Sequence, residues 1–330
     1  MRKLNRIMDH CRALGMTVAL LVIGTPPLYS AETAPIRATA VYGVVSTDSI
    51  YLWMAADKGI FKKNGLDLNL AHIPTNQAVQ ALIGGKINFS ASGPQALEAA
   101  LAGADTVYIL GPLNSFVVSI YAKPEISGIG GLSGKTIGVT NKGTPTDIAT
   151  RLVLKRNGLT PDADVKFAYL KENPALVAAL KEGVIDAATI PPPSTSQARS
   201  LGLKELINIT DLKIPFVQHA LASTRSYVNA DPEAVRRFVR SAVEGLQFSI
   251  KNRAEALSVL SKYTKITDTA LLNEALEAYE KAWEKIPLPS QAAVEAVLAV
   301  SPNPKAKSAR WDQFVDDRFV KELIASGALK

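Results

Sequence analysis

One segment of the chain occurs twice, and this repeat limits the folds that are open to it. The ten residues Val79–Asn88 align with Val177–Asp186, 98 positions further on, and five of the ten pairs are identical. Each copy runs from a helical pattern through a glycine into an apolar stretch typical of a strand. A proline follows at the same distance, at Pro94 and at Pro192. The repeat therefore predicts two halves that are built alike.

Strands alternate with helices through both halves. In the first half the pattern predicts strands over 36–44, 66–73, 87–91 and 106–111, and helices over 49–58, 75–83 and 94–102. In the second half it predicts strands over 136–140, 165–170 and 184–190, and helices over 145–157 and 174–182. We expect Thr144 and Asp147 to form a capping box, and Asn173 to cap the following helix. Repeated strand–helix–strand units predict mainly parallel sheets with helices on both faces.

Residues after Ala230 read as helices without strands of their own. A long helix is expected from Pro232, and others over 253–263, 268–285, 290–300 and 311–325. We expect these helices to pack on the first half and to brace it. The predicted organisation is a first lobe of residues 36–114 and 223–330, a second lobe of 115–222, and crossing spans at 114–122 and 215–223.

The N-terminal segment has the order of a secretory signal peptide. Four cations precede an uncharged apolar run over 13–24, and small residues follow. We expect residues 1–30 to be removed, with cleavage after Ser30 or Ala31, or nearer Ala34. The one cysteine, Cys11, leaves with this segment, so no disulfide framework is expected. The run is too short to span a membrane, and no later segment reaches 18 apolar residues.

The charge and the histidines exclude two classes of function. The formal net charge is +7, and removal of residues 1–30 lowers it to about +4, without a basic cluster interleaved with aromatic residues. We therefore expect no nucleic-acid partner. The three histidines, His10, His72 and His219, are not spaced as a pair, so no metal or cofactor is expected.

The candidate site follows from the predicted topology, because ligands of open α/β sheets bind at the carboxyl ends of the strands. Four loops end strands and lead into helices: 46–48, 91–94, 141–144 and 190–194. The free backbone N–H groups of a helix N-terminus favour an anion. From these loops and their surroundings the candidate ligand-binding residues are Ser46, Thr47, Asp48, Tyr51, Ser92, Gly93, Phe116, Lys142, Gly143, Thr144, Pro192 and Ser194.

Structural roles compete with binding at most of these positions. A serine, threonine or aspartate before a helix is an ordinary cap. Tyr51 and Phe116 fit a ligand stack or a core position about equally, and a lone loop lysine such as Lys142 is usually solvated. His219 fits a hydrogen-bonded structural histidine better than a ligand contact. No nucleophile motif, phosphate loop or carboxylate pair stands out, so no catalytic residue is predicted.

Four segments, in their order, carry a resemblance to a known family. They are Tyr51–Leu66, Gln80–Asn88, Leu132–Val139 and Ala179–Ala187. With them the chain resembles the periplasmic solute-binding proteins of nitrate, sulfonate and taurine ABC importers, which are related to thiamine-precursor binders. The resemblance covers residues 38–325 and implies a type II periplasmic-binding-protein fold that closes on its ligand by a hinge motion.

The resemblance also implies a function and further site residues. Ligand contacts of the family fall in loops that match 46–48, 92–93, 114–116, 143–146 and 191–194, which adds Asn114, Ser115 and Thr146 to the candidates. The stretch Pro191–Pro193 departs from the family, whose members often carry an aromatic or acidic residue there. The fungal pyrimidine-forming relatives use a cysteine-rich motif, which this chain lacks.

We therefore expect a periplasmic, monomeric binding protein that captures a small organic anion, such as a sulfonate, and delivers it to an ABC permease. An enzyme on the same scaffold, such as a lyase or dehydratase, is one alternative. A binding module that feeds a sensor is the other.

Overall fold

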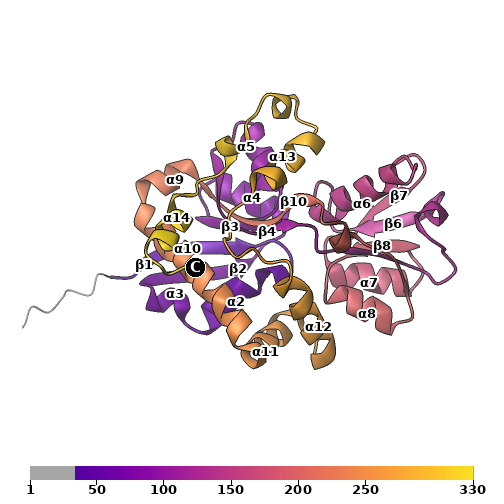
Figure 1. The fold of residues 1–330 in the computed structure, drawn as a ribbon, viewed down its shortest axis with the longest axis horizontal. Coiled ribbons are helices and arrows are strands. Elements are labelled where there is room, and N and C mark those ends of the chain that lie inside the picture. Colours follow the sequence, from indigo (N-terminus) through magenta and orange to yellow (C-terminus); the bar gives the residue numbers. More distant parts are fainter. Residues whose placement is uncertain (1–33, 330) are drawn as a thin grey trace, which may run out of the picture. The chain divides into compact units, whose positions relative to one another are not determined.

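The computed structural model describes residues 34–329, so the predicted signal peptide and Cys11 lie outside the described residues. The described chain forms two five-stranded sheets, each flanked by helices (Figure 1). We call the sheet β2-β1-β3-β10-β4 with its helices lobe 1, and the sheet β7-β6-β8-β5-β9 with its helices lobe 2. The predicted fold class is thereby confirmed.

The strands of lobe 1 are β1 (Ile36–Tyr42), β2 (Leu66–His72), β3 (Phe89–Ser92), β4 (Thr106–Ser115) and β10 (Pro215–Thr224). Those of lobe 2 are β5 (Ser119–Ala122), β6 (Thr136–Val139), β7 (Lys166–Tyr169), β8 (Ala187–Ile190) and β9 (Lys204–Asn208).

The two sheets share one topology, as the repeat predicts. In lobe 1, β1 runs parallel to β2 and β3, and β10 lies antiparallel between β3 and β4. In lobe 2, β6 runs parallel to β7 and β8, and β5 lies antiparallel between β8 and β9. The antiparallel strand of each sheet is the one that follows a crossing from the other lobe. Residues 215–222, assigned to the second lobe from the sequence, thus belong to β10 and to the first sheet.

Helices cover both faces of each sheet (Figure 1). Lobe 1 carries the 3₁₀ turn η1 (Thr47–Ser49), α2 (Ile50–Asp57), α3 (Ile60–Lys63), α4 (Thr75–Ile83) and α5 (Gln95–Leu101). Lobe 2 carries η2 (Ile129–Leu132), α6 (Pro145–Arg156), α7 (Asn173–Lys181), α8 (Ser194–Ser200) and η3 (Ile209–Leu212). The C-terminal part adds α9 (Arg225–Ala230), α10 (Pro232–Lys251), α11 (Arg253–Thr264), α12 (Thr269–Glu280), α13 (Gln291–Val300), η4 (Pro304–Lys307), η5 (Trp311–Phe314) and α14 (Arg318–Ala325).

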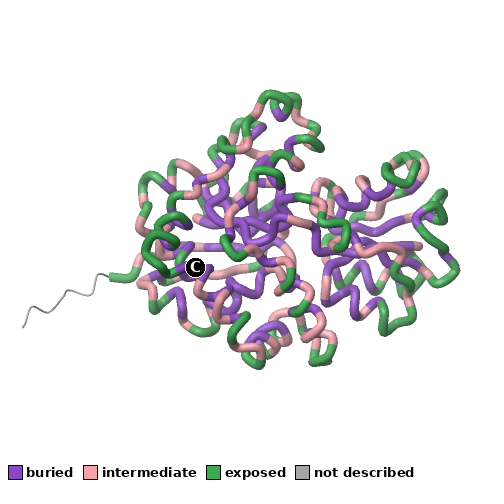
Figure 2. Tube along the Cα trace, in the orientation of Figure 1, coloured by how far each residue is buried: buried purple, intermediate pink, exposed green. Residues whose placement is uncertain are grey.

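The alternation of side chains along β1 separates two cores. Ala40 points to the face covered by α2 and α10, and its neighbour Val41 points to the face covered by α4, α5 and α13. The aromatic rings of Phe89 and Phe238 stack at 3.8 Å between the sheet and α10. Buried residues run through the middle of both sheets, whereas exposed residues mark the outer loops and helix ends (Figure 2).

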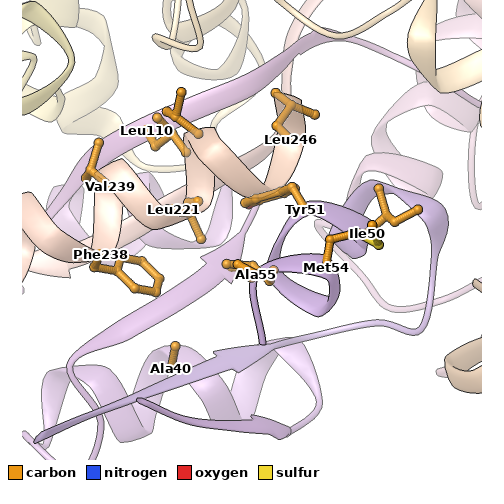
Figure 3. Packing of buried hydrophobic residues seen from close by; sticks show 14 of the residues in the cluster. Ala40, Ile50, Tyr51, Met54, Ala55, Leu110, Leu221, Phe238, Val239 and Leu246 are labelled. Carbon is orange, nitrogen blue, oxygen red and sulfur yellow. The ribbon is translucent and has the colours of Figure 1, made fainter. Parts of the chain in front are cut away.

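The long helix α10 packs closely on α2 because a glycine stands at the crossing (Figure 3). A Cβ atom at Gly245 would lie 2.2 Å from the backbone oxygen of Tyr51 and 3.0 Å from the Cβ of Ala55. Most of the C-terminal helices pack on lobe 1, but α12 also contacts α8 of lobe 2.

Four local predictions differ from the structure. Thr144 stands at the N-cap of α6, but the capping box is absent, because Asp147 accepts a hydrogen bond from the Gly143 N–H instead. Asn173 is the first residue of α7 and caps nothing. The helix predicted over 311–325 is broken, because Asp316 donates its N–H to the oxygen of Tyr108 at the edge of lobe 1. The helix predicted over 268–285 ends at Glu280.

Candidate ligand site

A pocket of about 60 Å³ lies where the two lobes meet. It opens at the carboxyl ends of β1 and β3 in lobe 1 and of β6 and β8 in lobe 2, as the switch-point rule for α/β sheets requires. The residues that line it are Gly43, Val44, Ser46, Asp48, Ser49, Thr75, Ala91, Ser92, Gly93, Gln95, Val118, Thr140, Thr144, Pro145, Thr146, Asn173, Pro191, Gln218 and His219.

Six of the residues that the sequence nominated line this pocket. They come from both lobes: Ser46, Asp48, Ser92 and Gly93 from lobe 1, and Thr144 and Thr146 from lobe 2. All six lie at the end of a strand, in the loop after it or in the first turn of the next helix. The strand-end argument named five of them, and the family resemblance named Thr146.

Other nominated residues have different roles. Tyr51 is fully buried in α2, and Phe116 stacks on Phe216 at 4.4 Å in the crossing region. The side chain of Asn114 donates to the Leu288 oxygen and accepts from the Ser290 N–H, so it anchors the segment before α13. Lys142 is exposed, and Ser115 lies outside the lining.

The remaining nominated residues lie beside the pocket and hold its walls. The Thr47 hydroxyl donates to the Pro192 oxygen across the lobes at 3.5 Å. The Gly143 oxygen accepts a hydrogen bond of 2.9 Å from the Gln95 side chain, which again joins the lobes. Ser194 is buried at the start of α8, outside the lining.

The sequence reasoning missed several polar residues of the site. Asn173 was expected to cap a helix, and Thr75 and Gln95 are the first residues of α4 and α5. Gln218 is buried in β10. A glutamine within a mostly apolar strand was the signal that could have marked it. His219 was noted only as a structural histidine, and it both lines the pocket and bonds to the core.

Two side-chain contacts outside the pocket lining join the lobes. Arg199 of α8 contacts Glu274 of α12 at 2.6 Å. His72 of β2 lies 3.6 Å from Glu172, which also accepts a hydrogen bond from the Val45 backbone. Burial raises the pKa of Glu172, and the nearby His72 acts in the opposite direction.

The lobe 2 wall carries a cluster of threonine hydroxyls at the N-terminus of α6. The hydroxyls of Thr140, Thr144 and Thr146 lie 2.9 to 3.1 Å from one another. Asp147, in the first turn of the same helix, is 2 % exposed and pairs with Arg151 at 2.8 Å. A carboxylate thus already lies at the positive end of this helix dipole.

The lobe 1 wall carries the pocket's carboxylate. An oxygen of Asp48 lies 3.5 Å from Nδ1 of His219, whose Nε2 lies 3.0 Å from the hydroxyl of Tyr51. Burial, and then the charge of Asp48, raise the pKa of Tyr51 well above its usual value. The Tyr51 hydroxyl, His219 and Asp48 thus form one chain of contacts that runs from the core to the pocket.

Unpaired polar atoms gather at the pocket. The oxygens of Ser92, Gln95, Asn173 and Gln218 are buried and form no hydrogen bond with any described residue. These four pocket-lining residues are half of the eight such cases in the described chain. Because each unmet buried group costs about 1–3 kcal/mol, their clustering makes this pocket the candidate ligand site.

Residues 34–329 contain no group of three or more acidic, histidine or cysteine side chains placed to hold a metal ion. Over the same residues, no helix has the length and apolar character needed to cross a membrane.

Comparison with solved structures identifies the fold. The periplasmic nitrate-binding protein NrtA of Synechocystis PCC 6803 superposes with a TM-score of 0.75 at 16% identity, over 88% of this chain and 89% of that one. The alkanesulfonate-binding protein SsuA of Xanthomonas axonopodis pv. citri, solved with bound MOPS, gives a TM-score of 0.66 at 20% identity, over 80% and 91%. The chain therefore has the fold of periplasmic binding proteins.

The sequence places it within a family. The NMT1/THI5-like family model matches residues 46–256, and the chain belongs to that family. A Brucella abortus protein named "putative binding protein" is 29% identical over 268 residues, which cover 79% of this chain and 81% of the relative.

Gly93 provides a test of lobe contact at the pocket. A Cβ atom there would lie 2.9 Å from the backbone oxygen of Gln218 and 3.3 Å from the ring of Pro145 in the opposite lobe. We expect Gly93→Ala to weaken ligand binding about tenfold, since overpacking costs roughly 1–3 kcal/mol. Calorimetric titration measures this, with Gly130→Ala as the control because its added methyl meets open space. Equal affinity of the two variants would contradict the assigned contact.

Proposed function

We propose that this chain is the extracytoplasmic solute-binding component of an ABC importer, which captures a small molecule between its lobes and presents it to a membrane permease. The pocket between the lobes carries this proposal, because residues from both lobes line it and four of them have unmet polar atoms. The names of the structural neighbours and the expected signal peptide support it. The proposal includes a monomer without a cofactor.

A thermal-shift screen tests the proposal. A ligand that binds only the folded protein raises its apparent stability, by about 2.7 kcal/mol at one hundred times the dissociation constant. We expect one class among sulfonates, nitrate, carboxylates, amides, amines and pyrimidines to raise the melting temperature in a saturable way. The same compound should lower the radius of gyration, because the lobes close on it. A panel without any stabilising compound would count against a solute-binding role.

The ligand class expected from the sequence was a small organic anion held at the Gly143–Thr146 helix end. The threonine hydroxyls there support it, since they can donate to an anion. Two observations oppose it: Asp147 already lies at this helix end, and no lysine or arginine is among the described residues that line the pocket.

The double variant Thr144→Ala, Thr146→Ala tests this wall for any ligand. Loss of two hydroxyls is expected to weaken binding about 30-fold, at roughly 1 kcal/mol per hydrogen bond, while unfolding stays cooperative. Thr150→Ala is the matched control, because Thr150 lies in the same helix but donates to the Thr146 oxygen away from the pocket. Unchanged affinity in the double variant would exclude these hydroxyls from the site.

One observation favours an enzyme as the second candidate. Asp48 and His219 form a carboxylate–histidine pair in the pocket. Incubation of the protein with a stabilising compound, followed by NMR of the compound, separates the two functions. A binding protein returns the compound unchanged, whereas an enzyme converts it.

A further inference from the structure

We propose that the pocket selects a small ligand with N–H donors, neutral or cationic, such as an amide or amidine, and that Asp48 is the residue that accepts from it. This inference rests on the proposed solute-binding function and narrows it to a ligand class. It replaces the anion expected from the sequence.

Asp48 is a carboxylate short of partners. Its side chain is 13 % exposed, and it lies in η1 at the carboxyl end of β1, where it lines the pocket. One oxygen accepts from the Ser49 hydroxyl at 3.2 Å, and the other has only the 3.5 Å contact with His219. Buried carboxylates are normally paired with a cation or with several strong donors. The remaining acceptor capacity of Asp48 is therefore available to a ligand.

Buried groups lie behind Asp48 on its core side. The hydroxyl of Tyr51 shares a hydrogen bond of 3.0 Å with His219 Nε2, and His219 Nδ1 lies 3.5 Å from the Asp48 carboxylate. Tyr279, also buried, bonds to Ser46 at 3.2 Å beside it. The pKa of Tyr279 is raised by burial and then by the charge of Asp48. The protonated phenols of Tyr51 and Tyr279 thus lie behind Asp48, and neither phenol supplies a positive charge.

The rest of the lining suits a ligand that donates hydrogen bonds. The unmet atoms of Asn173, Gln218 and Gln95 are side-chain amide oxygens, which accept hydrogen bonds, and the Gln95 nitrogen already donates to the Gly143 oxygen. An anion offers acceptors only. It would lie near the Asp48 carboxylate, and the described lining residues include no lysine or arginine. An amide or amidinium fits this lining, because its N–H groups donate to amide oxygens and form charge-assisted hydrogen bonds with a carboxylate.

Three compounds of one shape test the inference: acetate, acetamide and acetamidine. Each has four heavy atoms, and together they change the charge from −1 to +1 and add N–H donors. Affinities are measured by titration of the ¹⁵N-labelled protein, followed at the backbone amides of Gly43 and Gly93, which line the pocket. We expect acetamidine to bind the natural protein about tenfold more tightly than acetate, with acetamide between them.

Asp48→Asn is expected to reduce that preference to within about twofold, because the amide keeps the shape and loses the charge. Asp67→Asn is the matched control, since it removes a charge from an exposed site of lobe 1 and should keep the preference. The ranking on the natural protein stands as a test even if Asp48→Asn does not fold.

Tighter binding of acetate, or an unchanged preference in Asp48→Asn, overturns the inference and leaves the solute-binding function in place. Absence of any shift at Gly43 and Gly93 with all three compounds counts against the pocket as a ligand site, and so overturns both.

Discussion

Replacement of Gly245 by alanine is expected to lower the free energy of unfolding by about 2–3 kcal/mol, even though alanine favours a helix by roughly 1 kcal/mol over glycine. The added methyl would lie 2.2 Å from the Tyr51 backbone oxygen, so α10 and α2 must separate. Backbone atoms cannot rotate away as a side chain can. Figure 3 shows how Tyr51 and Ala55 of α2 lie against α10 at this crossing.

The same substitution is expected to lower the affinity for a ligand in the pocket. Separation of the helices displaces Tyr51, which is hydrogen-bonded to His219 behind Asp48. Chemical denaturation measures the loss of stability, and calorimetric titration measures the loss of affinity. Gly130→Ala is the control, because nothing lies within 4 Å of its added Cβ. A Gly245→Ala protein as stable as this control would refute the tight α2–α10 contact.

Asn173→Leu is expected to change stability and affinity in opposite directions. The Asn173 oxygen is buried and unpaired, so its replacement by an apolar group of similar size should raise the free energy of unfolding of the ligand-free protein by about 1 kcal/mol. Affinity should fall by about 10- to 100-fold, because the ligand loses a partner worth roughly 1–3 kcal/mol.

Thermal unfolding without ligand and calorimetric titration with a stabilising compound from the screen measure the two effects. Leu176→Ala is the comparison variant in the same helix, because Leu176 is fully buried in the core of lobe 2 and does not line the pocket. It should lose stability and keep affinity. An Asn173→Leu protein that loses stability and keeps affinity would assign Asn173 a structural role only.

The sequence repeat predicted the topology because both copies encode a helix that leads into a strand. Val79–Asn88 and Val177–Asp186 end α4 and α7 and lead into β3 and β8, which hold equivalent places in the two sheets. Periodicity identified these elements since their apolar faces are buried by neighbours within the same lobe. The place of β10 between β3 and β4 could not be predicted, because a crossing strand carries no local mark of its sheet.

The site was predicted only in part, for a related reason. Ser46, Ser92 and Gly93 lie at the end of a strand or in the loop after it, so the rule for strand ends finds them, whereas Thr146 came from the family resemblance. Asn173 and Gln218 belong to a helix and a strand, and they meet at the pocket only through the packing of two lobes. Lys142 lies in a loop that leads to the pocket, but its side chain is exposed. A loop sequence does not define which of its residues faces inward, so this residue could not be excluded from the sequence.

The central claim is that one small molecule is held between the two lobes, and the most direct test compares one variant from each wall. Calorimetric titration of the compound that best stabilises the protein should give one site per chain. Ser92→Ala in lobe 1 and Asn173→Leu in lobe 2 should each weaken binding at least about fivefold, at roughly 1 kcal/mol or more per lost hydrogen bond. Full affinity in either variant would place the ligand on one lobe alone and contradict the account.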